Sequence, residues 1–518
     1  ATSADEPSPW RWSCENNKCV KLRNDPQNQE PVLSMEACKM FCNEYGLLWP
    51  QPTGQVQLGN FLSKININNI VVERFKDVVA TAVPKGISPK ATGKAFAVNL
   101  VNNNPDLKEF SLGFDESYSI NVASLNDKVN ATITANSFFG LRHGLETLSQ
   151  LIVYDDIRNH VLIVRDVTIS DKPAYPYRGV LLDTARNYYT VDSIKSTIVK
   201  VSRSFPREDL ILADMELWLQ IYTKQQIGEV VQYGLERGVR VLPEFDAPAH
   251  VGEGWQDTGL TTCFNPPCGQ LNPAREELYE HLEDIYSDMA ADMFHMGGDE
   301  VNYRCWNSSD EIQRFMVQNR WDLQSSGFLK LWNYFQEKAQ NRAYKAFGKK
   351  LPLILWTSTL TEYSDVENYL NVNDYIIQVW TTGTNPHIKS LLKKGYRLII
   401  SNYDALYFDC GFGSWVGEGN NWCSPYIGWQ KVYDNDLSAM AGAEAALWSE
   451  QSDSATLEGR LWPRAAAMAE RLWSDPPGKW RDAEYRMLHM RERFIRMGID
   501  ADSLQPEWCY QNEGHCSS

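Results

Sequence analysis

Two adjacent carboxylates, Asp299 and Glu300, follow two glycines in the stretch FHMGGDEV at residues 294–301. Neighbouring side chains of a continuing strand point to opposite faces, so both acids serve one site only if the chain bends. Glycine permits such a bend because it adopts positive φ without steric penalty. Two carboxylates in one site cannot both ionise cheaply, so we expect one to hold a proton near neutral pH and act as a general acid. The pattern predicts acid–base chemistry, and the competing interpretation is a surface turn.

Other candidates for chemistry stand at the ends of short apolar segments. We predict strands in RGVLLD, VRVLPEFD, MFHM, LPLILW, YIIQVW, RLIISN and AEAALWSE, with amphipathic helices between them. The polar and aromatic residues assigned to these ends are Arg178, Asp183, Asp246, His250, Asp299, Glu300, Trp356, Trp380, Tyr407, Asp409, Trp448 and Glu450. The carboxyl ends of the strands of a barrel meet at one mouth, so this set would form a carboxylate pair ringed by tryptophans.

The elements that must position these residues alternate between strand and helix over residues 173–518. This alternation predicts an α/β fold with a (β/α)8 TIM barrel. Seven strands are clear, and DLILAD at residues 209–214 is a weak candidate for the second strand. Residues 51–172 combine strand-like alternation with a helical pattern and form a small α+β domain. Residues 1–50 are polar and rich in cysteine, and we expect a stapled extension there.

Composition narrows the class of partner. The 518 residues carry a formal net charge of −16 and include 18 tryptophans. A phosphate backbone would be repelled, which argues against nucleic acid as a partner. Tryptophan faces suit sugar rings, although tryptophan is also an ordinary core residue. No stretch approaches the roughly 18 apolar residues of a membrane span, and ATSADEPSP is no signal peptide, so we expect a mature soluble protein.

The cysteines indicate an oxidising compartment. Eleven are present, in close groups: Cys14, Cys19, Cys38 and Cys42; Cys263, Cys268 and Cys305; Cys410 and Cys423; Cys509 and Cys516. Such groups are typical of disulfides in an exported protein. Zinc is the competing interpretation for the first four, but they lack paired C-x-x-C spacing. The sequons Asn130-Ala-Thr and Asn307-Ser-Ser fit a secreted, extracellular glycoprotein.

The motif around the acids resembles a known family. His295-x-Gly-Gly-Asp-Glu, with Arg178-Gly-x-x-x-Asp upstream and tryptophans at later strand ends, resembles glycoside hydrolase family 20, the β-N-acetylhexosaminidases. VLPEFDAPAHVGEGW, LYFDCGFGSWVGEGNNWCSPYIGW and EAALWSEQSD are similar to the insect chitinolytic β-N-acetylglucosaminidases. The resemblance covers most of the chain. It implies that residues 51–172 are a zincin-like accessory domain, and that the enzyme uses no metal or cofactor. It also allows a homodimer and a lysosomal location.

The resemblance further implies an exo-acting, retaining mechanism in which the substrate's 2-acetamido carbonyl attacks its own anomeric carbon. Asp299 would stabilise the resulting oxazolinium, and Glu300 would protonate the leaving oxygen and later deprotonate water. The other implied roles are these: Tyr407 binds the acetamido oxygen; Trp356, Trp380 and Trp448 wall the N-acetyl group; Arg178, Asp409 and Glu450 bind the terminal sugar; Trp422 stacks on the next sugar; and His250 supports the acids.

The chain departs from the family pattern at the second strand, where the family has a His-Trp-His segment that supports the catalytic pair. A shortened TTCFNPPCG also leaves Cys263 or Cys268 to pair with Cys305. The alternative function is therefore a sugar-binding homologue with impaired catalysis. A third hypothesis is metal-dependent hydrolysis at His295, Asp299 and Glu300. The sequence leaves open whether the substrate is a chitin oligosaccharide or an N-glycan terminus.

Overall fold

The computed structural model describes most of the chain, namely residues 8–24, 32–67, 73–105, 112–204, 209–213, 222–252, 254–263, 269–289, 292–362 and 364–516. Two compact units are present. The N-terminal unit comprises Ala1–Ala174, Lys200–Arg207 and Glu458–Ser518, and the barrel unit comprises Tyr175–Val199 and Glu208–Leu457. The domain boundaries expected after residues 50 and 172 stay a prediction.

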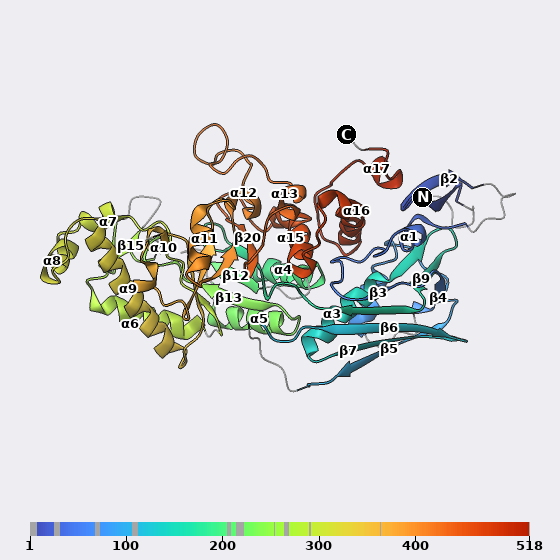
Figure 1. Ribbon diagram of the computed structural model, residues 1–518, viewed down its shortest axis with the longest axis horizontal. Coiled ribbons are helices and arrows are strands. Elements are labelled where there is room, and N and C mark those ends of the chain that lie inside the picture. The colour runs from blue at the N-terminus through green and yellow to red at the C-terminus, as the bar shows by residue number, and fades with distance from the viewer. Residues whose placement is uncertain are drawn as a thin grey trace. The chain divides into compact units, whose positions relative to one another are not determined.

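Eight parallel strands close into a barrel in the barrel unit (Figure 1). In barrel order they are β11 Tyr177–Asp183, β12 Asp209–Ala213, β13 Arg240–Glu244, β16 Phe294–His295, β17 Leu353–Trp356, β18 Tyr375–Val379, β19 Arg397–Ile400 and β20 Gly442–Leu447. The predicted TIM-barrel architecture is therefore confirmed. The weak candidate for the second strand is β12, which pairs with both β11 and β13.

The barrel strands form where short apolar runs can be covered on both faces. Every residue of β11, β17, β18 and β20 is buried, which is typical of parallel strands enclosed by helices. The connecting helices are α4 Val191–Ser204, α5 Lys224–Leu235, α6 Glu276–Met289, α7 Tyr303–Asn307, α8 Asp310–Gln318, α9 Ser325–Ala346, α10 Thr359–Glu362, α11 Pro386–Lys393, α12 Tyr403–Leu406 and α13 Trp429–Tyr433, with a 3-10 turn at Val366–Asn368.

Helix starts in this unit carry caps that the sequence encodes. At α5 the side chain of Thr223 accepts from the backbone N–H of Gln226, whose side chain in turn accepts from the N–H of Thr223. A capping box of this kind satisfies two otherwise unpaired donors and stabilises a helix by about 1 kcal/mol. The cap fixes where α5 begins, ahead of β13.

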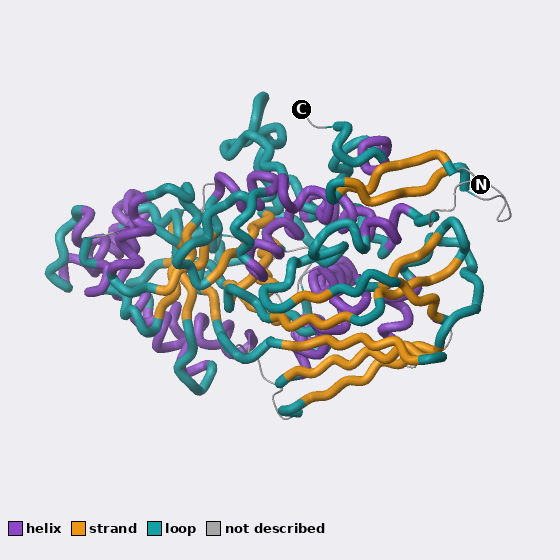
Figure 2. Tube along the Cα trace, turned by 45° about the vertical axis from the view of Figure 1, so that its right-hand side comes forward, coloured by secondary structure: helices purple, strands orange, loops and turns teal. Residues whose placement is uncertain are grey.

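The N-terminal unit is built on a five-stranded mixed sheet, whose long strands run side by side in Figure 2. Its order is β3 Val56–Gln57, β10 Val167–Asp171, β6 Tyr118–Leu125, β7 Lys128–Ala135 and β5 Ala95–Asn102. Helix α3, Phe138–Gln150, packs on β6 and β7 through a core that includes Ile120, Ile133 and Leu148. Helix α3 confirms the helical pattern expected within residues 51–172, and its first residue, Phe138, is exposed.

The remaining elements of this unit are β1 Trp10–Glu15, β2 Lys18–Arg23, α1 Met35–Lys39, β4 Leu62–Ile65, α2 Glu73–Ala80, β8 Ile152–Asp155, β9 His160–Val164, α14 Leu457–Leu461, α15 Arg464–Ser474, α16 Trp480–Arg496 and α17 Glu507–Gln511.

Disulfides join the cysteines within their sequence groups. The pairs are Cys14–Cys42, Cys19–Cys38, Cys263–Cys305, Cys410–Cys423 and Cys509–Cys516. The first two staple the β1–β2 hairpin to the segment around α1, as expected for a Cys-rich extension. Cys263 is thus the partner of Cys305, and Cys268 lies outside the described residues.

Candidate active site

The chain bends at the two glycines that precede the acids. Gly297 and Gly298 follow β16 with φ of 63° and 89°, a region that favours glycine. A Cβ on Gly297 would overlap the side chain of Asp246, and the N–H of Gly298 donates to Asp246 Oδ1 at 2.8 Å. The paired glycines therefore let the backbone after β16 bend and approach Asp246, which follows β13.

A buried histidine supports this bend. The N–H of Gly297 donates to Nδ1 of His295 at 3.0 Å. Burial lowers the pKa of His295 to about 3, so the imidazole is neutral and its nitrogen can accept. His295 thereby has a structural role at the base of the loop.

His250 lies among three carboxylates and connects the two acids. Its Nδ1 is 2.5 Å from Asp246 Oδ2 and 3.7 Å from Asp299 Oδ1, while its Nε2 is 3.1 Å from Glu300 Oε2. Asp246 and His250 come from the loop after β13, and Asp299 and Glu300 come from the loop after β16. Neighbouring strands of the barrel thus bring the four groups together.

The two acids have opposite pKa shifts. Burial raises the pKa of Asp299 well above its usual range, and the charges of Asp246 and Glu300 raise it further. The hydrogen bond from His250 lowers the pKa of Glu300, whose side chain is 58% exposed, against the opposing effect of desolvation. Burial thus favours the protonated form of Asp299 in the free site, whereas the hydrogen bond from His250 favours the ionised form of Glu300, the residue expected to be the general acid.

The surroundings of His250 favour its protonated form. Burial alone would lower its pKa, but the charges of Asp246 and Asp299 and the hydrogen bonds to Asp246 and Glu300 raise it well above the usual value. Burial also opposes the ionisation of Asp246, yet His250 and the N–H of Gly298 lower the pKa of that carboxyl. The result is an ion pair between the buried Asp246 and the partly buried His250, which lies close to both acids.

Aromatic rings continue from this cluster. The ring centroids of His295 and Trp356 are 5.0 Å apart, those of Trp356 and Trp448 are 6.0 Å apart, and those of Trp448 and Tyr407 are 6.3 Å apart. Desolvation raises the pKa of Tyr407 well above its usual value, and the charge of Asp299 acts in the same direction. Tyr407 is therefore within the electrostatic influence of Asp299.

The remaining predicted tryptophans differ in their surroundings. The indole N–H of Trp380 donates to the carbonyl of Thr357 at 2.7 Å, directly after Trp356 at the end of β17. Trp422 is 66% exposed, and its ring lies 6.2 Å from that of Tyr407. It belongs to the long loop between α12 and α13, which extends above α12 in Figure 1 and is closed by Cys410–Cys423. Asp409 is half-buried on the same loop and its charge also acts on Tyr407.

The loop after β20 is fixed to the first strand. Asp183 ends β11 and accepts from the N–H and hydroxyl of Ser449, each at 2.9 Å. Glu450 follows, and its pKa is raised by desolvation and by Asp183, with Arg186 and His250 acting in the opposite direction. Glu450 and Trp448 therefore lie within electrostatic reach of the cluster.

Arg178 is placed differently from the sequence-based expectation. It is the second residue of β11 and pairs with Ala443 near the start of β20, so it lies toward the amino ends of the strands. Its guanidinium donates to the carbonyl of Tyr175 at 2.5 Å. The assignment of Arg178 to the carboxyl ends was wrong because the first strand begins at Tyr177 and ends six residues later.

Two residues near the acids were given no role in the sequence analysis. Asp246 was noted at a strand end, and its position four residues before His250 was the available signal. Arg186 was missed: its guanidinium contacts Asp183 at 3.3 Å and lies 5.2 Å from the Trp448 ring. No simple spacing marks Arg186, because its place depends on the turn that follows β11.

Comparisons with known proteins agree with this geometry. The pattern described as "Glycosyl hydrolase family 20, catalytic domain" matches residues 208–476, and "beta-acetyl hexosaminidase like" matches residues 85–151. The chitooligosaccharidolytic beta-N-acetylglucosaminidase of Ostrinia furnacalis is 66% identical over 568 aligned positions, covering 98% of this chain and 96% of the relative. The protein of the same name from Bombyx mori is 64% identical, covering 99% and 96%.

The Ostrinia alignment is longer than the 518 residues of this chain, so that relative has stretches which this chain lacks. This agrees with the shortened segments that the sequence indicated.

Solved structures show the same fold. The chitobiase of Flavobacterium johnsoniae has a TM-score of 0.68 at 22% identity, covering 88% of this chain and 73% of its own. The family 20 beta-N-acetylhexosaminidase of Streptomyces coelicolor A3(2) has a TM-score of 0.66 at 21% identity, covering 89% and 98%. These likenesses indicate a barrel preceded by an accessory domain. Matched along nearly its whole length and built on the same fold, the chain belongs to glycoside hydrolase family 20.

Proposed function

We propose that this protein is an exo-acting, retaining β-N-acetylhexosaminidase that removes terminal N-acetylglucosamine from chitin oligosaccharides or glycans, with N-acetylgalactosamine also accepted. The observation that carries the proposal is the contact of His250 with both Asp299 and Glu300, together with the influence of the Asp299 charge on Tyr407, whose ring neighbours that of Trp448. The names of the Ostrinia and Bombyx relatives support the choice of chitooligosaccharides.

In the first step the acetamido carbonyl oxygen of the substrate attacks C1, and the bond from C1 to the leaving oxygen breaks. Glu300 gives a proton to that oxygen, and an oxazolinium cation forms. Asp299 acts as a carboxylate: it accepts from the acetamido N–H and stabilises the cation, because the positive charge beside it favours the ionised form over the protonated form that burial favours in the free site. Water then attacks C1, Glu300 accepts a proton from it, and the acetamide is restored.

His250 supplies the proton that Glu300 lacks in the free enzyme. The imidazolium Nε2 is 3.1 Å from Glu300 Oε2, and Asp246 holds the other nitrogen at 2.5 Å. Transfer across this hydrogen bond leaves a neutral imidazole oriented by Asp246 and a protonated Glu300 ready for the leaving group. His250 is thus the supporting residue, and Asp246 fixes its orientation.

Aromatic and polar side chains would hold the sugar. Tyr407 donates its hydroxyl to the acetamido oxygen, and the N-acetyl group packs among Trp356, Trp380 and Trp448. Asp409 and Glu450 bind hydroxyls of the terminal sugar. The exposed Trp422 stacks on the next sugar of a chitin oligosaccharide. A similar role for Arg178 is supported by the resemblance alone, since that residue lies toward the amino ends of the barrel strands.

The two competing functions have weaker support. The metal hypothesis named His295, but Nδ1 of that residue accepts from the N–H of Gly297, and His295 belongs to no group of three potential metal ligands among the described residues. Impaired catalysis was inferred from the absent His-Trp-His segment. The barrel nevertheless has its second strand, and Asp246 with His250 supplies direct support to Glu300. An active glycosidase is therefore favoured over a sugar-binding homologue.

We further propose that the N-terminal unit is a zincin-like accessory domain and that the protein works outside the cytosol, as a secreted or lysosomal enzyme. Five disulfides support an oxidising compartment. Of the two sequon residues, Asn307 is exposed and Asn130 is half-buried. None of the helices in the described ranges has both the length and the apolar character needed to cross a membrane. A homodimer is also proposed on the resemblance alone.

The test is hydrolysis of a chromogenic β-N-acetylglucosaminide by the full chain and by Glu300→Gln. Loss of the general acid should lower kcat by about 10²–10⁴-fold while the variant still folds. Activity of Glu300→Gln equal to that of the parent would rule out the assigned acid. A chitobiose substrate compared with a glycan terminus then decides between the two substrate classes.

A further inference from the structure

A short hairpin, β14 Thr261–Thr262 with β15 Gln270–Leu271, is fastened to the loop that carries His250. The N–H of Leu271 donates to the carbonyl of Pro248 at 2.8 Å, and the N–H of Val251 donates to the carbonyl of Gly269 at 3.2 Å. A Cβ on Gly269 would overlap the backbone of Gly252, so the two backbones are in direct contact. The hairpin and the His250 loop are therefore hydrogen-bonded and packed directly against each other.

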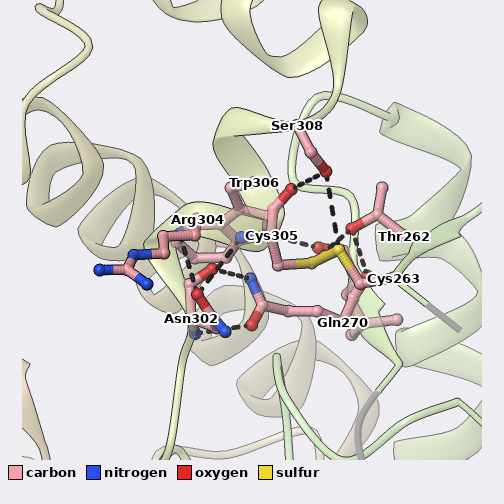
Figure 3. The surroundings of a disulfide bond; sticks show 9 residues. Thr262, Cys263, Gln270, Asn302, Arg304, Cys305, Trp306 and Ser308 are labelled. Carbon is pink, nitrogen blue, oxygen red and sulfur yellow. Dashed lines mark hydrogen bonds between the residues drawn. A yellow bond between two sulfur atoms is a disulfide. The ribbon is translucent and has the colours of Figure 1, made fainter. Parts of the chain in front are cut away.

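The opposite side of the hairpin is fastened to the chain just after Glu300. The side-chain amide of Gln270 pairs with the backbone of Asn302: Oε1 accepts from the N–H at 2.8 Å, and Nε2 donates to the carbonyl at 3.2 Å (Figure 3). Gln270 is only 1% exposed, so both bonds are shielded from water. Asn302 in turn caps α7, accepting from the N–H groups of Arg304 and Cys305.

Two further links strengthen this side. The Cys263–Cys305 disulfide joins the hairpin to α7, as Figure 3 shows, and the indole N–H of Trp306 donates to the carbonyl of Leu271 at 2.9 Å. The hairpin thus bridges the two loops whose side chains meet in the hydrogen bond between His250 and Glu300.

We infer that Gln270 is a positioning residue for the reaction, which sets the separation between His250 and Glu300 by holding the backbone at Asn302. This inference rests on the proposed roles of those two residues. Glu300 is largely exposed and its backbone has a φ of 50°, so its placement depends on how the chain on either side is held. The bend at Gly297 and Gly298 holds one side, and Gln270 holds the other.

Weakening the hydrogen bonds between Gln270 and Asn302 should change the pH dependence of catalysis. The titratable groups whose charges interact with His250 are Asp246, Asp299 and Glu300, together with Glu450 from the loop after β20. If Glu300 moves away, His250 loses one of the bonds that favour its protonated form, and the alkaline limb of kcat/KM moves to lower pH. We expect a shift of about one pH unit and a roughly tenfold fall in kcat, with KM changed by less than about threefold.

The experiment uses the full chain and a chromogenic β-N-acetylglucosaminide. Gln270→Met keeps the length of the side chain and removes both bonds, while Gln270→Asn keeps the amide but is too short to remake both. Gln150→Met is the matched control, because the amide of Gln150 makes the same two bonds to the backbone of Trp49, each at 2.7 Å, within the N-terminal unit. All variants are checked for folding by thermal unfolding.

The inference is supported if both Gln270 variants shift the alkaline limb, Gln270→Met by more, and Gln150→Met does not. It is overturned if the limb stays in place for a folded Gln270 variant, or if the control shifts it equally. If Gln270→Met does not fold, Gln270→Asn decides. Full activity of Glu300→Gln would instead contradict the proposed function. If Glu300→Gln is inactive but the Gln270 variants keep the pH profile of the parent, only the inference about Gln270 fails.

Discussion

Two of the histidines that lie beside carboxylates in this molecule, His250 and His489, differ in protonation state. His250, in the barrel unit, contacts Asp246 and Glu300 and has a pKa raised well above the usual value. His489, on α16 of the N-terminal unit, lies 3.4 Å from Glu36, yet burial lowers its pKa to about 3. Contact with a carboxylate therefore does not by itself decide whether a buried histidine is protonated.

The difference lies in the neighbouring cations. Glu36 also pairs with Arg496 at 3.3 Å, and the charges of Arg496, Lys39 and Arg493 all act against protonation of His489. Around His250 three carboxylates gather, and their charge is balanced only if protons are taken up. An excess of carboxylates favours the protonated form of a neighbouring histidine, whereas nearby cations disfavour it. A group with a raised pKa among carboxylates is suited to acid–base chemistry.

Replacing His250, which holds the proton next to Glu300, is expected to have the largest effect on activity. In the His250→Asn variant the last proton of the pair belongs to Glu300 rather than to an imidazole, so the alkaline limb of kcat/KM should fall by about two pH units or more. Together with the lost support of the acid, this should lower kcat/KM roughly 10³-fold at pH 8. The matched control is His489→Asn, whose pH profile of activity should be that of the parent.

An alkaline limb that stays in place in His250→Asn would mean that Glu300 keeps its proton unaided.

The cluster around His489 and Glu36 should instead affect how the stability of the fold depends on pH. His489 is neutral when folded and protonates in the unfolded chain below about pH 6.5, so acid favours unfolding. Between pH 6.5 and 4 this costs about 3 kcal/mol of unfolding free energy, a loss that His489→Gln should abolish. The measurement is denaturant unfolding at several pH values, compared between variant and parent.

The comparison with the parent is needed because Asp171 has the opposite sign. Burial raises its pKa to about 6, so its contribution to stability is lost as pH rises from about 4 toward 6. A difference between variant and parent that does not change with pH would contradict the neutral, buried state of His489.

The smallest effect should come from the cation near the catalytic cluster. The charge of Arg186 lowers the pKa of both Asp246 and Glu300. Because its side chain is 30% exposed, the interaction is partly screened, and Arg186→Gln should move the alkaline limb upward by only about half a pH unit. A limb that moves downward would show that Arg186 acts through its contact with Trp448 and not through its charge.

Much of the fold followed from the sequence because buried parallel strands are short apolar runs with polar ends. Even β12 was visible as DLILA, although its polar flanks weakened the pattern. The bend at Gly297 and Gly298 was also predictable, since the adjacent acids required it and glycine alone tolerates the close approach of Asp246.

The features that escaped prediction depend on distances between loops. Which acid holds the proton was not accessible from sequence, because burial of Asp299 and the hydrogen bond between His250 and Glu300 decide it. Arg178 was misplaced by one strand length, since a motif fixes order along the chain and not height within the barrel. Gln270 carries no motif, and its importance appears only when Asn302 is seen beside it.

The backbone at the site has a thermodynamic consequence. His250 and Glu300 adopt φ of 59° and 50°. This is the left-handed region, which costs a residue other than glycine about 1–2 kcal/mol. The free energy of unfolding of an ordinary domain is only about 5–15 kcal/mol. Holding His250 and Glu300 in this conformation thus costs a noticeable part of the free energy of unfolding. Packing in the rest of the barrel must offset that cost.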